Sequence, residues 1–185
     1  MVSRQLRKKN GFICFIPAAV TAVILMISSK GLSQTTAAAL KFDFGSGLVA
    51  EGYTQVLPTT VFTPERGYGF EPNTVVRAVD RGSGDALRSD FITSEIPFLF
   101  SIRLPEGNYK VTMTFGDAEG ESTTTVKAEL RRLMLENIRT AIGQFDTRTI
   151  IVNIRTPDIA SGGQVRLKER ERTTEFAAWD DKLTL

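Results

Sequence analysis

Apolar and polar residues alternate on both sides of a short turn in the middle of the chain. Every second residue is apolar from 98 to 104 and again from 109 to 115. Period two is typical of a β-strand with one buried face. Between the two runs, Pro105 restricts φ and Gly107 tolerates positive φ, as tight turns require. The pattern predicts a β-hairpin over residues 97–117 at the centre of the fold.

Shorter stretches with the same period occur along most of the chain, separated by loops rich in Gly and Pro. The segment 128–138 also contains good helix formers, but charged residues interrupt any apolar stripe, so we interpret it as strand. Many short strands with such loops predict an all-β domain, a two-sheet antiparallel β-sandwich of the jelly-roll type. Strands are expected at 38–44, 86–93, 123–130, 133–139, 146–156, 165–167 and 179–185.

The first 33 residues differ from the rest. A basic start is followed by an apolar run over residues 11–27 and then by small and polar residues. This order is typical of a secretory signal peptide, so we expect a leader at 1–33, a linker at 34–37 and the sandwich at 38–185. The alternative is an uncleaved anchor, because roughly 17 apolar residues is the lower limit for spanning a bilayer. The expected location is the periplasm or the extracellular space, with membrane contact only through this leader.

The net charge of +2 comes from this N-terminal segment. From Gln34 onward the chain has 18 basic and 21 acidic residues, a net charge of −3. The mixed charge run 168–175 is typical of a solvated loop or strand end. We therefore expect no nucleic-acid partner.

The residue types also exclude several chemistries. The chain has no histidine, and its one cysteine, Cys14, lies within the apolar run. A Ser-His-Asp triad, a Cys-His pair and a zinc site with His or Cys ligands are therefore excluded for residues 34–185. Chemistry based on carboxylates, for example Asp90 with Asp80 or Glu71, remains open, and so does an oxygen-ligated Ca²⁺.

Several segments together resemble the N-terminal galactose-binding-like domain of bacterial rhamnogalacturonan acetylesterases, in which a β-sandwich precedes an SGNH (GDSL-type) hydrolase domain. The resemblance covers nearly all of residues 38–185 and depends on the order and combination of the motifs. These are KFDFGSG (41–47), GYTQVLPTT (52–60), GYGFE (67–71), DALRSDF (85–91), LPEGNY (104–109), TVKAELRRLML (125–135) and WDDKLTL (179–185).

The chain departs from this family where catalysis is concerned. The family's nucleophile block is Gly-Asp-Ser, whereas the similar block here is Gly116-Asp117-Ala118. The nucleophilic serine and the catalytic histidine are therefore both absent. The resemblance implies a non-catalytic module that binds carbohydrate or positions a pectin (rhamnogalacturonan) acetylesterase-like enzyme, with the sandwich truncated at its C-terminal end. The alternative is a structural domain that packs on the missing hydrolase domain and binds no sugar.

Carbohydrate sites usually combine an aromatic ring with planar hydrogen-bonding groups. We predict that Tyr68 and Phe70, in a Gly-rich loop, and Trp179 supply the rings. Arg88 and Asp90, two residues apart and so on one face of a strand, supply the polar groups. Packing of the rings and a structural Arg–Asp ion pair are the competing interpretations. The resemblance implies plant cell-wall pectin as the partner, and an arginine also suits the carboxylates of its uronic acids.

One metal ligand is predicted. Alternation over 179–185 places Asp181 on the same face as Trp179, either buried or at a sheet edge. Related sandwiches often hold a structural Ca²⁺ between the first and last strands, so the resemblance implies that Asp181 is a ligand. Pairing of Asp181 with an arginine or with the backbone is the alternative. No other cofactor is expected.

Overall fold

The computed structural model describes residues 18–27, 39–82, 84–175 and 179–185, and almost all of its regular structure is strand. The elements are β1 (Ala18–Ile27), β2 (Ala39–Phe44), β3 (Thr54–Val56), β4 (Tyr68–Phe70), β5 (Arg77–Asp80), β6 (Asp90–Ser94), β7 (Phe100–Arg103), β8 (Gly107–Gly116), β9 (Ser122–Ala128), β10 (Arg132–Thr140), β11 (Phe145–Ile154), α1 (Glu169–Thr173) and β12 (Lys182–Thr184).

A seven-stranded sheet forms the larger layer. Its strand order is β11-β8-β1-β2-β3, and β6, which carries β5, also pairs with β1. The pairs are antiparallel except β2–β3, which is parallel. The strand β1 falls within the apolar run that the sequence indicates to be a leader; residues 1–17 and 28–38 lie outside the described part.

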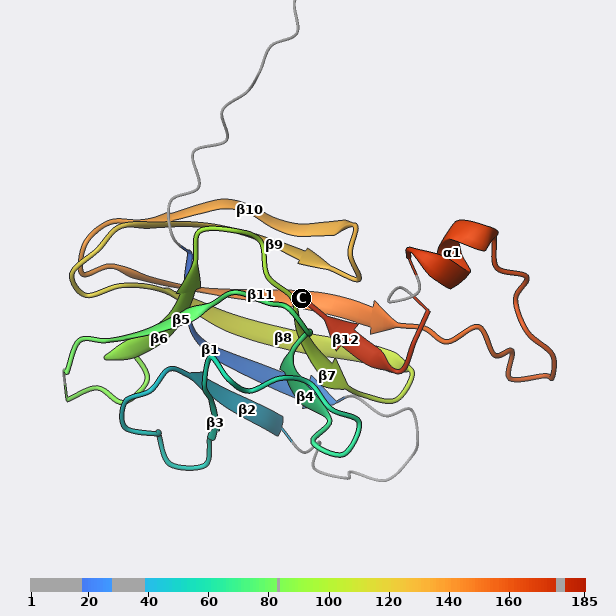
Figure 1. The fold of residues 1–185 in the computed structure, drawn as a ribbon, viewed down its shortest axis with the longest axis horizontal. Helices are drawn as coiled ribbons and strands as arrows, with labels where there is room; N and C mark the ends of the chain where they lie inside the picture. The colour runs from blue at the N-terminus through green and yellow to red at the C-terminus, as the bar shows by residue number, and fades with distance from the viewer. Residues whose placement is uncertain (1–17, 28–38, 83, 176–178) are drawn as a thin grey trace, which may run out of the picture.

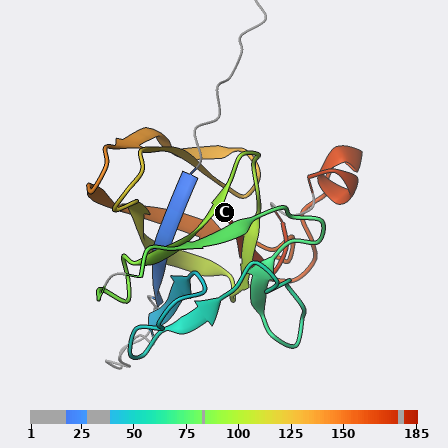
Figure 2. The same ribbon diagram turned by 60° about the vertical axis from the view of Figure 1, so that its left-hand side comes forward.

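Two smaller sheets complete the described fold. One has the order β12-β7-β4, and the other is the β9–β10 hairpin. Figures 1 and 2 show the hairpin along one side of the large sheet and α1 projecting from the body. The all-β sandwich predicted from the sequence is confirmed. No described helix has the length and apolar character needed to cross a membrane.

The hydrophobic core lies between the large sheet and the β12-β7-β4 sheet. Phe44 of β2 and Phe70 of β4 both contact the ring of Phe100 in β7, with ring centroids 4.8 and 5.4 Å apart. Alternate residues of β8 and β11 also lie in this core, and Val111 and Ile154 have no exposed surface. The alternation read from the sequence is therefore the pattern that fills this core.

The predicted central hairpin is wrong in its pairing. Its two strands exist as β7 and β8, but β7 pairs with β4 and β12, whereas β8 pairs with β1 and β11. The turn at Pro105 and Glu106 leads the chain from one sheet to the other. Both strands bury alternate residues in one core from opposite sides, so their patterns match those of a hairpin.

Three other expectations also differ from the structure. The segment 168–175 contains the short helix α1 rather than a loop, and residues 165–167 form no strand. The Gly-rich segment around Tyr68 is strand β4 rather than a loop. Gly69 in this strand has φ of 146°, and the backbone of Phe62 lies so close that a Cβ would not fit there. By contrast, the interpretation of 128–138 as strand rather than helix is confirmed, because β9 and β10 pair across that segment.

Candidate functional site

The predicted aromatic residues do not form one sugar-stacking surface. Phe70 has 1% exposed surface and packs against Phe98 and Phe100, so its ring is part of the core. Tyr68 is half-buried, with its ring 5.0 Å from that of Phe42. The prediction that Phe70 stacks on a sugar therefore conflicts with its burial, since β4 points this ring inward.

Arg88 and Asp90 do not share a strand face. Arg88 lies in the turn before β6 and makes an ion pair with Asp85, Nη1 to Oδ2 3.8 Å. Its guanidinium also lies 5.2 Å from the ring centroid of Phe145. Asp90 is the first residue of β6, has 2% exposed surface, and accepts a hydrogen bond of 2.6 Å from the backbone N–H of Gly47. The structure thus separates the two residues into different environments.

The C-terminal candidates lie beside arginines. Trp179 is half-buried, and the guanidinium of Arg155 lies 4.8 Å from its ring centroid. The Nε of Arg103 donates to Oδ2 of Asp181 at 2.6 Å, and half of the Asp181 side chain is exposed. Asp181 is therefore paired with an arginine, which was the alternative to its being a Ca²⁺ ligand. The described residues contain no group of three acidic, His or Cys side chains that could hold a metal ion.

The acidic residues considered for carboxylate chemistry are held in structural contacts. Asp80 is opposite Asp90 in the β5–β6 register and accepts the N–H of Gly82. Glu71 accepts hydrogen bonds from Lys182 and Ser101. Burial raises the pKa of Asp90, and the neighbouring charge of Asp80 adds to the effect. Because Asp90 is buried, these carboxylates offer a substrate no common surface.

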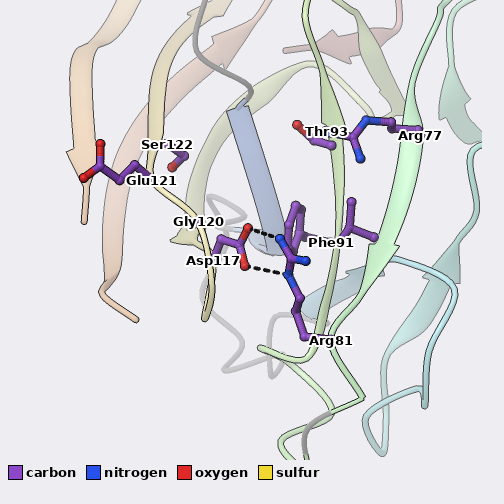
Figure 3. Close-up of a pocket in the computed structure, with 9 residues that line it drawn as sticks. Arg77, Arg81, Phe91, Thr93, Asp117, Gly120, Glu121 and Ser122 are labelled. Atoms are coloured by element: carbon purple, nitrogen blue, oxygen red, sulfur yellow. Dashed lines mark hydrogen bonds and ion pairs between the residues drawn. The ribbon is translucent and has the colours of Figure 1, made fainter. Parts of the chain in front are cut away.

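A pocket lies between the β5–β6 ribbon and the loop that follows β8. Its volume is about 170 Å³. The register places Arg77 opposite Thr93 and Val79 opposite Phe91 on its floor, and the loop from Asp117 to Ser122 forms the facing wall (Figure 3).

A bidentate ion pair holds the ribbon and the loop together. Arg81 donates from Nε and Nη2 to the two carboxylate oxygens of Asp117 at 2.9 and 2.7 Å, as Figure 3 shows. Burial raises the pKa of Asp117, but the hydrogen bonds and charge of Arg81 together with the backbone N–H groups of Glu119 and Gly120 outweigh it, and the net pKa is lowered. Oε2 of Glu119 also makes an ion pair with Nη1 of Arg81, at 3.2 Å. The charge of Arg81 is therefore satisfied by the protein itself.

Two other groups in the pocket have no such partner. Within the described residues, the exposed guanidinium of Arg77 makes no ion pair or side-chain hydrogen bond. The hydroxyl of Thr93, which is 1% exposed, also has none. Buried hydroxyls are normally hydrogen-bonded. Of these two groups only the exposed guanidinium of Arg77 can reach a ligand, and it can bind a carboxylate or a sugar hydroxyl.

Sequence reasoning did not identify Arg77, Thr93 or Arg81. Arg77, Val79 and Arg81 alternate with Ala78 and Asp80, which is the signal for a short strand with two arginines on one face. The ion pair with Asp117 spans 36 positions in the sequence and left no local signal.

Comparisons with known proteins are consistent with this fold. The family described as beta-agarase/YxiM esterase-like, galactose-binding domain-like matches residues 40–152. The uncharacterized esterase YxiM of Bacillus subtilis (strain 168) is 33% identical over 108 residues, 54% of this chain and 28% of that protein. Beta-agarase A of Zobellia galactanivorans is 30% identical over 119 residues, 62% of this chain and 21% of that protein. A crystal structure of YxiM aligns with a TM-score of 0.48 at 30% identity, covering 62% of this chain and 32% of the other. This chain therefore spans less than a third of the length of both curated relatives.

Proposed function

Because the chain belongs to the galactose-binding-like domain family of beta-agarases and YxiM-like esterases, we propose that it is a non-catalytic, carbohydrate-binding module that acts outside the cytoplasm. Its ligand is an acidic polysaccharide of the pectin (rhamnogalacturonan) class. The relatives that share the domain are named as an esterase and an agarase. The basic and apolar N-terminal sequence supports export.

The observation that carries the proposal is the exposed guanidinium of Arg77, which has no ion-pair partner among the described residues. Arg77 supplies a cation in a fork geometry that matches the carboxylate of a uronic acid. Exposed Glu121 on the facing wall can accept hydrogen bonds from sugar hydroxyls. Phe91 has only 3% exposed surface, so recognition depends on hydrogen bonds and charge rather than on stacking.

Arg77→Ala is expected to weaken binding to rhamnogalacturonan about tenfold or more, because hydrogen bonds to a charged group contribute about 1.5–3 kcal/mol. Affinity gel electrophoresis with the polysaccharide in the gel measures this as lost retardation. Arg166→Ala is the matched control, since Arg166 is an exposed arginine in the loop after β11 and does not line the pocket. Equal retardation of both variants and wild type would refute the assignment of Arg77.

Thr93→Val separates binding from folding. The change removes a buried hydroxyl without a partner and keeps the volume, so the free energy of unfolding stays the same or rises by up to about 1 kcal/mol. Binding is expected to stay the same, because the Thr93 hydroxyl has no accessible surface in the pocket. Thr124→Val is the control, because Thr124 also has a buried hydroxyl with no partner among the described residues but lies outside the pocket. Thermal melts and the same gels test both variants, and loss of sugar binding by Thr93→Val alone would contradict this placement of its hydroxyl.

The second candidate is a positioning domain that packs on a hydrolase and binds no sugar. Two exposed apolar side chains favour it, Val75 and Ile96, which are 65% and 53% exposed. They lie at one end of the β5–β6 ribbon, where the hydroxyl of Ser94 donates to the carbonyl of Val75 and accepts the N–H of Ile96. Absence of retardation of the wild-type chain on every pectin fraction selects this function over the first.

A further inference from the structure

The strand β1 joins parts of the large sheet that otherwise do not pair with one another. On one edge it pairs with β8 over Val20 to Ile27. On the other edge it pairs with β2 over residues 22–26 and with β6 over residues 18–20. Without β1, the sheet separates into three two-stranded ribbons, β8–β11, β2–β3 and β5–β6. Isolated two-stranded ribbons are marginally stable in water.

The strands on both sides of β1 carry the core. Its register partners include Phe42 on β2, Ile92 on β6 and Tyr109, Val111 and Met113 on β8, each with at most 3% exposed surface. If the place of β1 were vacant, the backbone groups of these strands that face it would lose their ladder partners. The core residues beside them would also lose their cover.

The sequence of β1 suits this central place. The segment AAVTAVILMI has no charged residue and is rich in β-branched residues, as is typical of a strand buried within a sheet. At 10 residues it has the same length as β8 and β11. The same apolar run has the composition of a signal-peptide core, and hydrophobicity alone does not distinguish the two.

We propose that the large sheet contains a strand-acceptor slot between β2 and β8 and that Ala18–Ile27 of this chain occupies it. The segment that starts as an export signal then serves as the central strand, antiparallel to β2, β6 and β8. A chain from which residues 18–27 have been removed keeps its three ribbons but loses the connected sheet.

The test starts from the full chain with a site for a specific protease inserted between Ile27 and Ala39. After cleavage under native conditions, the N-terminal fragment is expected to co-elute with the body on size exclusion and the melting curve to stay cooperative. After separation in denaturant, the body alone is expected not to recover that melt, and a synthetic peptide of residues 18–27 with lysine tails restores it. Release of the fragment with an unchanged melt, or full recovery by the body alone, would overturn the proposal.

A second pair of chains keeps the test informative if the cut protein aggregates. Ile24 is opposite both Lys41 and Thr112, so Ile24→Pro removes a backbone donor in the middle of the ladder. Its full-length chain is expected to melt at least ten degrees lower and to lose hydrogen-exchange protection at the amides of β2 and β8 that face β1. Ser33→Pro, outside the described strands, is the control. Equal protection in both chains contradicts occupancy of the slot.

Discussion

Gly116→Ala is expected to lower the free energy of unfolding by about 2–4 kcal/mol. Gly116 ends β8 with φ of 143°, a region that residues with a side chain rarely adopt. A Cβ there would lie 2.3 Å from the carbonyl oxygen of Gln144 and 2.7 Å from Cδ1 of Phe145. Phe145 is the register partner of Gly116 in β11, so the strands must separate to admit a methyl group. Asp117 follows directly, so the ion pair to Arg81 shifts as well and sugar binding falls.

Urea unfolding of the variant measures this loss as a lower midpoint. Gly84→Ala is the matched control, because Gly84 has ordinary φ and no atom within 4 Å of a Cβ. Its stability is expected to change by less than about 0.5 kcal/mol. Equal midpoints for the two variants would show that the close approach of β8 and β11 at Gly116 is absent.

The domain is expected to be more stable at pH 5 than at pH 8, with a melting temperature higher by several degrees. Burial raises the pKa of Glu129 from 4.5 to about 7 and that of Asp43 from 3.8 to about 6. Each has 2% exposed surface, and one oxygen of each carboxylate lacks a hydrogen-bond partner in the described structure.

The direction of this pH dependence follows from the number of protons that the folded and unfolded chains bind. As the pH rises from 4.5 to 7, the unfolded chain loses the Glu129 proton first, while the folded chain keeps it. Between pH 4.5 and 7 the folded state binds more protons than the unfolded state. The contribution of protonated Glu129 to the free energy of unfolding is therefore complete below pH 4.5 and is lost as the pH rises through 7. Asp43 acts in the same direction between pH 3.8 and 6.

Glu129→Gln is expected to remove most of the fall in melting temperature above pH 6. Glutamine keeps an oxygen that accepts the Thr184 N–H, which Oε1 of Glu129 now accepts at 3.1 Å, and it has no charge to bury. Glu136→Gln, at an exposed site on β10, is the control. Melting temperatures at half-unit steps from pH 4 to 8 test this, and an unchanged slope in the Glu129 variant would contradict the assignment.

The sequence predicted the strands of this fold better than their partners. Alternation identified β8 and β11 because each buries every second residue over much of its length. It assigned β7 and β8 to one hairpin because a strand shows which of its faces is buried but not which strand lies beside it. The segment at Tyr68 was taken for a loop because it contains glycines, and pairing with β7 determines its strand conformation.

The site was less predictable than the fold. Arg81 and Asp117 are brought together by tertiary structure, and Arg103 and Asp181 are 78 positions apart. Local patterns therefore could not give the partners of these residues. Single aromatic residues such as Phe70 were misleading, because ring stacking on sugars and ring packing in a core require the same residue type. The alternating arginines at 77 and 81 were the available signal.

Assigned amide NMR spectra of the chain, titrated with a galacturonate-containing rhamnogalacturonan oligosaccharide, test whether the pocket binds an acidic sugar. We predict saturable shifts at Arg77, Thr93 and Gly120, around the pocket in Figure 3, and weaker or no shifts in the Arg77→Ala chain. Saturable shifts confined to other surfaces, or no shifts at millimolar oligosaccharide, would contradict it.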